Sequence, residues 1–341
     1  MSSRVETHAV TPDRIGRLAL AFREAKAVLS ATELDVFTAL ADGPREGHVL
    51  AKAIGIHERG ARDFFDALTA LGLLARDDDG RYRNAPDADL YLDRRKPSYV
   101  GGELEHMNGY VYPHWNLLTA ALRTGEPQSG ARATGHYSAL YADPVALERL
   151  AKGMTDGSLP VANSLSAKFP WRDYRTVVDI GTAQGCMPVQ IARVFPHITG
   201  GGFDLPPMRP HFDGYVRAHG LSERLQFIAG DFLRDPLPAA DVLVFGRVLH
   251  NWDLATKQML LSKAYEALPK GGAVIVYERL IDDERRSNAA ALLASLNMLI
   301  LTAGGFDFTG ADCISWMRDA GFGDIWVKNL ISEISMIVGR K

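Results

Sequence analysis

The sequence predicts an α/β protein in which a doubly wound, mostly parallel sheet follows a mostly helical N-terminal domain. The first observation is a short β-branched strand, Val177 to Ile180, that ends at Gly181 and leads into an apolar helix from Met187 to Phe195. Strand, glycine turn and helix in this order form the first βα unit of such a sheet. The second observation is that strand and helix patterns alternate from there to the end of the chain. The third is a helix, helix, helix, hairpin pattern before residue 84.

The composition is typical of a globular protein. With 341 residues the chain is long for one hydrophobic core, which favours two or three domains. A formal net charge of −3 gives no basic surplus for nucleic acid or an anionic membrane, and no apolar run is long enough to span a bilayer. The two cysteines, Cys186 and Cys313, are far apart, and the polar segment 1–13 lacks a signal-peptide core. These features predict a cytoplasmic protein.

The N-terminal region has a winged-helix pattern. Helical spacing predicts helices within Ile15–Leu40, Val49–Ile54 and Glu58–Leu74, and a β-hairpin follows at 75–83 around an Asp-Gly pair. Winged helices often bind DNA. Here, however, acids match bases on the helix that would read the groove, and Asp77 to Asp79 at the wing tip would repel phosphates. We therefore predict a homodimer contact in this region and no nucleic-acid partner.

Residues 99–170 are predicted to form several helices separated by polar turns. Apolar and aromatic residues with scattered histidines mark this region and could together line a flat pocket, although for each one alone a place in the core is the commoner explanation. They are His106, Met107, Tyr110, Tyr112, His114, Trp115, His136, Tyr137 and Tyr141.

Alternating patterns define the rest of the α/β region. The predicted strands are Ile198–Leu205, Leu225–Ala229, Asp241–Phe245, Ala273–Tyr277, Ile325–Asn329 and Ile334–Val338. The predicted helices are Phe212–His219, Lys257–Leu268, Ala289–Leu301 and Gly310–Ala320.

The glycine turn favours an adenosyl cofactor without phosphates, such as S-adenosylmethionine. Gly181 lacks a Cβ and allows close approach of a ligand, but the G-x-G-x-x-G pattern of dinucleotide sites is absent. Asp204 ends the second strand, 23 residues after Gly181, where a carboxylate can accept both ribose hydroxyls. Asp231 and Phe232 follow the third strand and offer an acid and a ring to the adenine. Each acid alone could equally be a strand end or helix cap.

A candidate acid–base centre follows the fourth strand. Arg247, His250 and Trp252 occur together just beyond its carboxyl end. The unperturbed pKa of histidine is about 6.5, so the imidazole is a competent base at neutral pH while a phenol with a pKa near 10 is still protonated. Glu278 closes the fifth strand and could orient this imidazole, and Asp307 is a second candidate carboxylate.

Together these motifs resemble a known family, the S-adenosylmethionine-dependent O-methyltransferases that include plant caffeate and acetylserotonin methyltransferases and bacterial antibiotic-tailoring enzymes. The resemblance covers nearly the whole chain. The matching motifs are Asp179-Ile180-Gly181, Phe203-Asp204-Leu205-Pro206, Gly230-Asp231-Phe232, Leu249-His250-Asn251-Trp252-Asp253 and Asn297-Met298-Leu299.

The resemblance implies a domain plan and a set of site residues. It implies a winged-helix-like dimerisation domain at 1–98, a helical linker and acceptor-pocket region at 99–170, and a Rossmann-like class I methyltransferase domain at 171–341. The cofactor would contact Gly181, Asp204, Asp231, Phe232, Arg247 and Trp252. By the same resemblance His250 would be the general base, Glu278 and Asp307 would be its carboxylate partners, and Asn297 and Met298 would face a small aromatic acceptor.

Three positions depart from the family pattern. Gly181-Thr182-Ala183 replaces three glycines, and Asn251 replaces an aspartate. Phe306-Asp307-Phe308-Thr309 stands where the family commonly has Arg-Glu-Arg-Thr, which makes this part of the pocket less cationic and weakens the assignment of Asp307.

Other activities remain alternatives at this stage. The same scaffold could perform C-methylation, or hydroxylation or decarboxylation with bound cofactor. A regulator that binds an adenosyl ligand would need a basic recognition helix, which the sequence lacks. A metal-dependent catechol methyltransferase would need acids and histidines at metal-binding spacing, and the sequence shows no such cluster.

Overall fold

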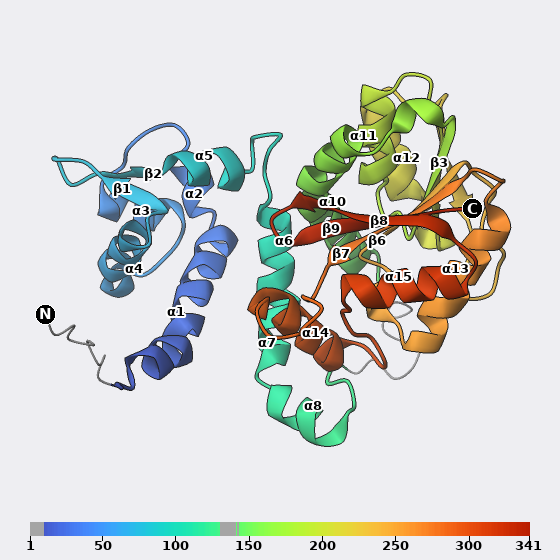
Figure 1. Cartoon of the computed structure of the whole chain (residues 1–341). Helices are drawn as coiled ribbons and strands as arrows, with labels where there is room; N and C mark the ends of the chain where they lie inside the picture. The colour runs from blue at the N-terminus through green and yellow to red at the C-terminus, as the bar shows by residue number, and fades with distance from the viewer. Residues whose placement is uncertain (1–9, 130–140, 142) are drawn as a thin grey trace, which may run out of the picture. The chain divides into compact units, whose positions relative to one another are not determined.

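The structure is a computed structural model that describes residues 10–129, 141 and 143–341. It divides into two compact units, Met1–Asn108 and Gly109–Lys341 (Figure 1). Two of the predicted pocket residues, His136 and Tyr137, lie outside the described residues.

The first unit has the predicted order of helices followed by a hairpin. Its elements are α1 (Asp13–Glu33), α2 (Val36–Ala39), α3 (Gly47–Ala53), α4 (Glu58–Ala70), β1 (Leu74–Arg76), β2 (Tyr82–Asn84), α5 (Pro86–Leu92) and α6 (Gly101–His106). The helical region predicted over 15–40 is two helices, because Asp35 adopts a left-handed φ of 57° between them. Phe37, Phe65 and Tyr82 are buried at the centre of this unit, which accounts for the aromatic residues of α4 as packing residues.

The second unit is built on a seven-stranded sheet within the described residues. Its strands are β3 (Thr176–Ile180), β4 (Thr199–Asp204), β5 (Leu225–Ala229), β6 (Val242–Gly246), β7 (Ala273–Arg279), β8 (Gly323–Ile331) and β9 (Ile334–Arg340). The strand order is β5-β4-β3-β6-β7-β9-β8. The first five of these pair in parallel, whereas β9 is antiparallel to both β7 and β8. The predicted mostly parallel sheet is confirmed, with an antiparallel pair at one edge.

Helices cover both faces of this sheet. On one face lie α13 (Leu254–Ala267) and α15 (Gly310–Asp319), and on the other lie α10 (Pro144–Lys168) and α11 (Cys186–Val194). The other helices are η1 (Met107–Val111), α7 (Tyr112–Trp115), α8 (Leu118–Thr124), α12 (Arg209–Ala218) and α14 (Ala289–Leu301). Short 3-10 turns occur at η2 (Trp171–Asp173), η3 (Pro206–Met208) and η4 (Leu249–Asn251).

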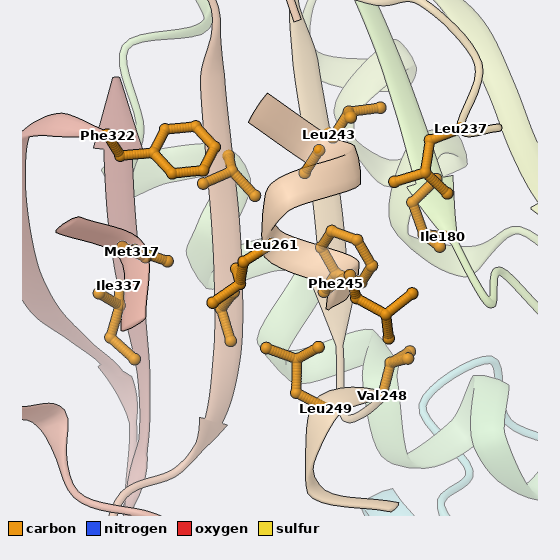
Figure 2. Close-up of a cluster of buried hydrophobic side chains, with 14 of the residues drawn as sticks. Ile180, Leu237, Leu243, Phe245, Val248, Leu249, Leu261, Met317, Phe322 and Ile337 are labelled. Atoms are coloured by element: carbon orange, nitrogen blue, oxygen red, sulfur yellow. The ribbon is translucent and has the colours of Figure 1, made fainter. Parts of the chain in front are cut away.

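The strand periodicity assigns side chains to the two faces. Val178 and Ile180 point to the face covered by α13 and α15, whereas Val177, one residue before them, points to the face covered by α10 and α11. Figure 2 shows the first of these clusters, in which Val248 and Leu249 continue the buried side chains beyond the end of β6. The turn that carries His250 is therefore anchored in the core.

Two boundaries differ from the predictions in ways that affect the site. Strand β7 continues to Arg279, so Glu278 lies within the strand, not beyond it. Helix α13 begins at Leu254, three residues before the predicted start, because the Asp253 carboxylate accepts a hydrogen bond from the backbone N–H of Thr256. Lys257 is consequently in the first turn of this helix.

Candidate active site

Glycine and apolar side chains meet at the carboxyl ends of the central strands. Gly181 follows β3 with a φ of +72°, a conformation that L side chains rarely adopt. A Cβ at this position would lie 3.0 Å from Cγ2 of Val248 and 3.9 Å from Cε1 of Phe232. The ends of three strands, β3, β5 and β6, therefore meet at Gly181, and only glycine leaves the space between them open.

The turn after Gly181 is tied to the neighbouring strand. Ala183 has a φ of +50°, which costs a residue with a Cβ about 1 kcal/mol or more. Its backbone N–H donates to Oδ2 of Asp204 at 2.9 Å, and this bond helps to hold the turn in place. The replacement of a family glycine by Ala183 is thus compatible with the turn but introduces strain.

Asp204 is more enclosed than its predicted role suggests. It is almost completely buried, and its Oδ1 accepts hydrogen bonds from the Leu205 N–H at 2.7 Å and the Tyr141 hydroxyl at 2.9 Å. Burial raises the pKa of this carboxyl to about 6. With the Ala183 bond, three of about four acceptor positions of the carboxylate are already used, so a ligand hydroxyl would share or displace the Tyr141 contact.

Asp231 and Phe232 follow β5 and have different surroundings. Asp231 accepts a hydrogen bond from the Leu233 N–H at 2.9 Å, which closes its own turn. The Phe232 ring packs edge-to-face on Trp252, with centroids 5.7 Å apart. Because this ring also faces Gly181, the structure brings together three of the six predicted cofactor residues: Gly181, Phe232 and Trp252.

Two carboxylates from separate parts of the second unit converge on His250. The imidazole, on η4, has 15% of its side chain exposed, whereas Glu278 and Asp307 have only 1% each. The Nδ1 atom of His250 lies 3.3 Å from Oδ1 of Asp307 and 3.5 Å from Oε2 of Glu278. Glu278 also accepts the backbone N–H of His250 at 3.3 Å. All three predicted catalytic residues are therefore close together.

The charges of this cluster are strongly coupled. Burial by itself lowers the pKa of His250, but the Glu278 and Asp307 carboxylates outweigh it and raise that pKa above 6.5. Burial raises the pKa of Glu278 to about 7, although the nearby His250 partly offsets this effect. A proton on Nδ1 is directed at the carboxylates, which leaves Nε2 as the basic nitrogen of the neutral imidazole.

The same three residues are also a potential metal-binding group. One ligand atom from each lies within 4.8 Å of the others. Sequence spacing could not show this group, because Glu278 and Asp307 are 28 and 57 residues away from His250. The distances from Nδ1 to the carboxylate oxygens are close to those of N–H···O hydrogen bonds, so we interpret the group as a proton site.

Comparison with known proteins decides the family. Residues 115–323 match the model of the O-methyltransferase domain, and residues 17–94 match the model of the O-methyltransferase dimerisation domain. The chain belongs to the S-adenosylmethionine-dependent O-methyltransferase family. The family and the fold expected from the sequence motifs are confirmed.

Individual relatives support this assignment over most of the chain. The tetracenomycin polyketide synthesis 8-O-methyltransferase of Streptomyces glaucescens is 43% identical, over 98% of this chain and 98% of its own length. The N,N-dimethyltransferase OxyT of Streptomyces rimosus is 37% identical, over 90% of this chain and 89% of its own. The structure of human N-acetylserotonin methyltransferase in complex with S-adenosylmethionine has a TM-score of 0.91 at 26% identity, covering 100% of this chain and 99% of that one.

The residues around Gly181 suit the cofactor of this O-methyltransferase family. The space at Gly181 is bounded by an aromatic ring, Phe232, and by Val248, which suits the flat adenosine part of the molecule. The Asp204 carboxylate at the adjacent strand end suits ribose hydroxyls. When bound, the cofactor supplies a sulfonium methyl group as the electrophile.

The predicted acceptor residues lie on α14, where α7 and α8 pack. The Asn297 Oδ1 accepts a hydrogen bond from Nε1 of Trp115 at 3.0 Å, which joins two residues that the sequence placed in the pocket. Met298 is 8% exposed and so has little surface to offer to a ligand. The Tyr110 and His114 rings contact each other nearby on η1 and α7, with centroids 4.8 Å apart.

The sequence analysis missed a buried cation beside the site. Lys257 is 0% exposed and lies on α13. The sequence contains a pattern that could have predicted this burial. Leu260, Leu261 and Ala264 follow Lys257 at spacings of three, four and seven residues, so the lysine lies on the buried stripe of its helix. A lysine in such a stripe is an exception to the amphipathic pattern.

Among the described residues, no helix combines the length and the apolar character needed to cross a membrane.

Proposed function

We propose that this protein transfers the methyl group of S-adenosylmethionine to a phenolic hydroxyl of a small aromatic molecule, with His250 as the general base. The observation that supports the proposal most is the largely buried imidazole whose Nδ1 lies near two carboxylates. Carboxylates that orient a histidine and stabilise its protonated form are a recurrent device of general-base catalysis. The family membership supplies the reaction.

In this mechanism each residue of the cluster has one role. The acceptor hydroxyl donates a hydrogen bond to Nε2 of His250, which takes the proton as the oxygen attacks. Glu278 and Asp307 hold the imidazole through Nδ1 and stabilise the imidazolium that forms. The acceptor oxygen must be in line with the reactive methyl group at roughly 3 Å, so binding of the acceptor ring determines much of the rate.

The chemical class of the methyl acceptor is inferred from relatives and from the contact between Trp115 and Asn297. One relative acts in tetracenomycin polyketide synthesis. A structural neighbour from neocarzinostatin biosynthesis, with a TM-score of 0.74, was solved with 2-hydroxy-5-methyl naphthoic acid. In this chain the Trp115 indole N–H donates a hydrogen bond to Oδ1 of Asn297. The amide N–H groups of Asn297 can then donate to an oxygen of the methyl acceptor. We infer a hydroxylated polycyclic aromatic acceptor of the polyketide type.

The remaining site and domain assignments are part of the same proposal. Asp231 and Arg247 would complete the cofactor contacts, and Met298 would contact the edge of the acceptor. The division at 1–98, 99–170 and 171–341 would correspond to dimerisation, acceptor binding and methyl transfer.

The first unit is proposed to form a homodimer. Residues 17–94 match a dimerisation domain. Helix α1 exposes a set of large apolar side chains, among them Ile15 at 67%, Leu18 at 64% and Phe22 at 54%. Covering such a surface with a second copy removes apolar area from water, at about 25 cal/mol per Å². The proposal of a cytoplasmic protein without nucleic-acid or membrane partners is retained from the sequence.

A second candidate is N-methylation, because the relative OxyT is named as an N,N-dimethyltransferase. An amine that is already neutral needs no general base, so this reaction would make less use of the His250 cluster. Within residues 10–129, 141 and 143–341, no contact favours C-methylation, hydroxylation or decarboxylation.

The proposed function is tested with a methyl-deuterated cofactor and a matched acceptor pair. The pair consists of a hydroxynaphthoate and its amino analogue, and mass spectrometry locates the label. We expect the label on the phenolic oxygen, with little product from the amine. Label on nitrogen or carbon, or no product from a panel of phenols when calorimetry shows bound cofactor, would contradict the proposal.

A further inference from the structure

Lys257 is a charged side chain with no exposed surface. Removing an ammonium group from water is costly, and burial lowers the pKa of Lys257 to about 8 although Glu278 and Asp307 act in the opposite direction. Methionine or leucine would fill this position in the apolar stripe of α13 without that cost. A buried lysine here therefore requires a reason other than packing.

The contacts of the ammonium join two segments of the active site. Its Nζ donates to the Trp252 carbonyl at 2.5 Å, two residues after His250. The same Nζ lies 3.2 Å from the ring centroid of Phe306 and 5.7 Å from that of Phe308, the two residues that flank Asp307. The segments on either side of Lys257 thus carry the base and one of its carboxylates.

These two segments also touch directly. A Cβ at Gly305 would lie 2.6 Å from the His250 carbonyl oxygen, so the backbones are in close contact. On the other side, Val248 and Leu249 fix the His250 turn in the core beside Leu261 of α13 (Figure 2). A small movement of Lys257 would therefore be transmitted to the distance between His250 and Asp307.

The charges around the cluster give Lys257 a second role. The groups that act on His250 are Glu278, Asp307 and Arg247. Those that act on Lys257 are Glu278, Asp307, Asp253 and Cys313. The two buried carboxylates are common to both sets. A positive charge beside them opposes the uptake of a second proton by the imidazole.

We propose that Lys257 is a positioning residue for methyl transfer: its ammonium holds the His250 turn against the Asp307 segment and balances the Glu278 and Asp307 carboxylates. The inference rests on the proposed function, because it assigns His250 the role of base. This role of Lys257 accounts for Phe306 and Phe308 on either side of Asp307, because their rings contact an ammonium group that helix α13 supplies.

A purely structural role predicts different behaviour. Lys257→Met keeps the length of the side chain and removes the charge. In either case methionine fills the space and removes the desolvation cost of the ammonium, so stability alone does not separate the two roles. If Lys257 only fills space, the protonation of His250 stays unchanged in this variant. If Lys257 sets the charge of the cluster, His250 becomes easier to protonate.

The experiment measures the protonation of His250 directly. Histidine labelled with 13C at Cε1 is titrated by NMR in the full chain, and His250→Gln assigns the signal. In Lys257→Met we expect the protonation midpoint of His250 to move up by about 0.5 to 1 pH unit. We also expect the rate at pH 7 to fall about 3- to 10-fold and to recover at higher pH, because each pH unit below the midpoint reduces the neutral base about tenfold.

Lys263 provides a matched control on the same helix. Its Nζ also donates to a backbone carbonyl, that of Phe232, at 2.6 Å. Lys263→Met removes the same group and is expected to affect cofactor affinity while leaving the His250 midpoint unchanged. A second variant, Lys257→Gln, keeps a donor for the Trp252 carbonyl without the charge and should shift the midpoint as Lys257→Met does.

The outcomes separate this inference from the proposed function. An unchanged His250 midpoint in folded Lys257→Met or Lys257→Gln protein would overturn the role of Lys257. The expected NMR shift in a protein whose wild type transfers no methyl to any phenol would support the charge coupling and contradict the proposed reaction.

Discussion

Asp204→Asn tests whether the buried carboxylate at the end of β4 organises the cofactor site. The substitution keeps the shape of the side chain and removes its charge. In the wild type the carboxylate accepts hydrogen bonds from the N–H groups of Ala183 and Leu205 and from the Tyr141 hydroxyl. An asparagine amide group would present N–H donors towards at least one of these donors, so one bond is lost and the strained Ala183 turn loses its support.

The expected size of the effect follows from these contacts. A hydrogen bond to a charged group contributes about 1.5–3 kcal/mol, which corresponds to about a 10- to 150-fold increase in the Kd for S-adenosylhomocysteine. The pH dependence has a defined sign. Because burial raises the pKa of Asp204 to about 6, the affinity of the wild type should fall as the pH decreases through that value. The variant should lack this dependence.

Calorimetry with S-adenosylhomocysteine measures both effects, and Asp241→Asn is the matched control. Asp241 also accepts two backbone N–H groups, those of Arg175 and Thr176, but at the amino end of β3. Its substitution should lower the thermal midpoint and leave cofactor affinity unchanged. Equal affinity of wild type and Asp204→Asn, both folded, would refute the reasoning.

Three further predictions concern assembly, stability and metal. Leu18→Asp on α1 should convert the homodimer to a monomer in light scattering, and a dimer that persists at micromolar concentration would place the interface elsewhere. Burial raises the pKa of Asp179 and of Glu278 to about 7, so the folded state retains protons that the unfolded state releases, and the thermal midpoint should fall as the pH rises from about 5 to 7.5. Asp179→Asn should flatten this slope, and an unchanged slope would mean that other groups cause it. A chelator should leave the rate unchanged; a loss reversed by a divalent cation would show that the His250 group binds metal.

Local patterns were sufficient to predict most elements of the second unit. The bounds of β5 and α14 agree with the predicted segments, because a short alternating apolar segment and a continuous apolar run of helical length can both be seen in short windows. The sequence also predicted that Gly181 and Phe232 lie close together, since parallel strands bring their carboxyl ends to the same edge of a sheet.

Contacts between distant segments could not be predicted in the same way. Asp307 reaches His250 from 57 residues away, along a loop whose path depends on how α14 and α15 pack. The bond between Tyr141 and Asp204 joins residues 63 apart, and no periodicity encodes it. Lys257 had a local signal, its place in an apolar stripe, but only the structure shows the rings that hold its ammonium.

The central claim, that His250 removes the acceptor proton, is tested most directly by the turnover of His250→Ala as a function of pH. The claim predicts a loss of about 10²- to 10⁴-fold at neutral pH with nearly unchanged cofactor affinity. The rate of the variant should recover as rising pH ionises the phenol without help. Wild-type turnover by well-folded His250→Ala protein would show that the base lies elsewhere or that the reaction is not O-methylation.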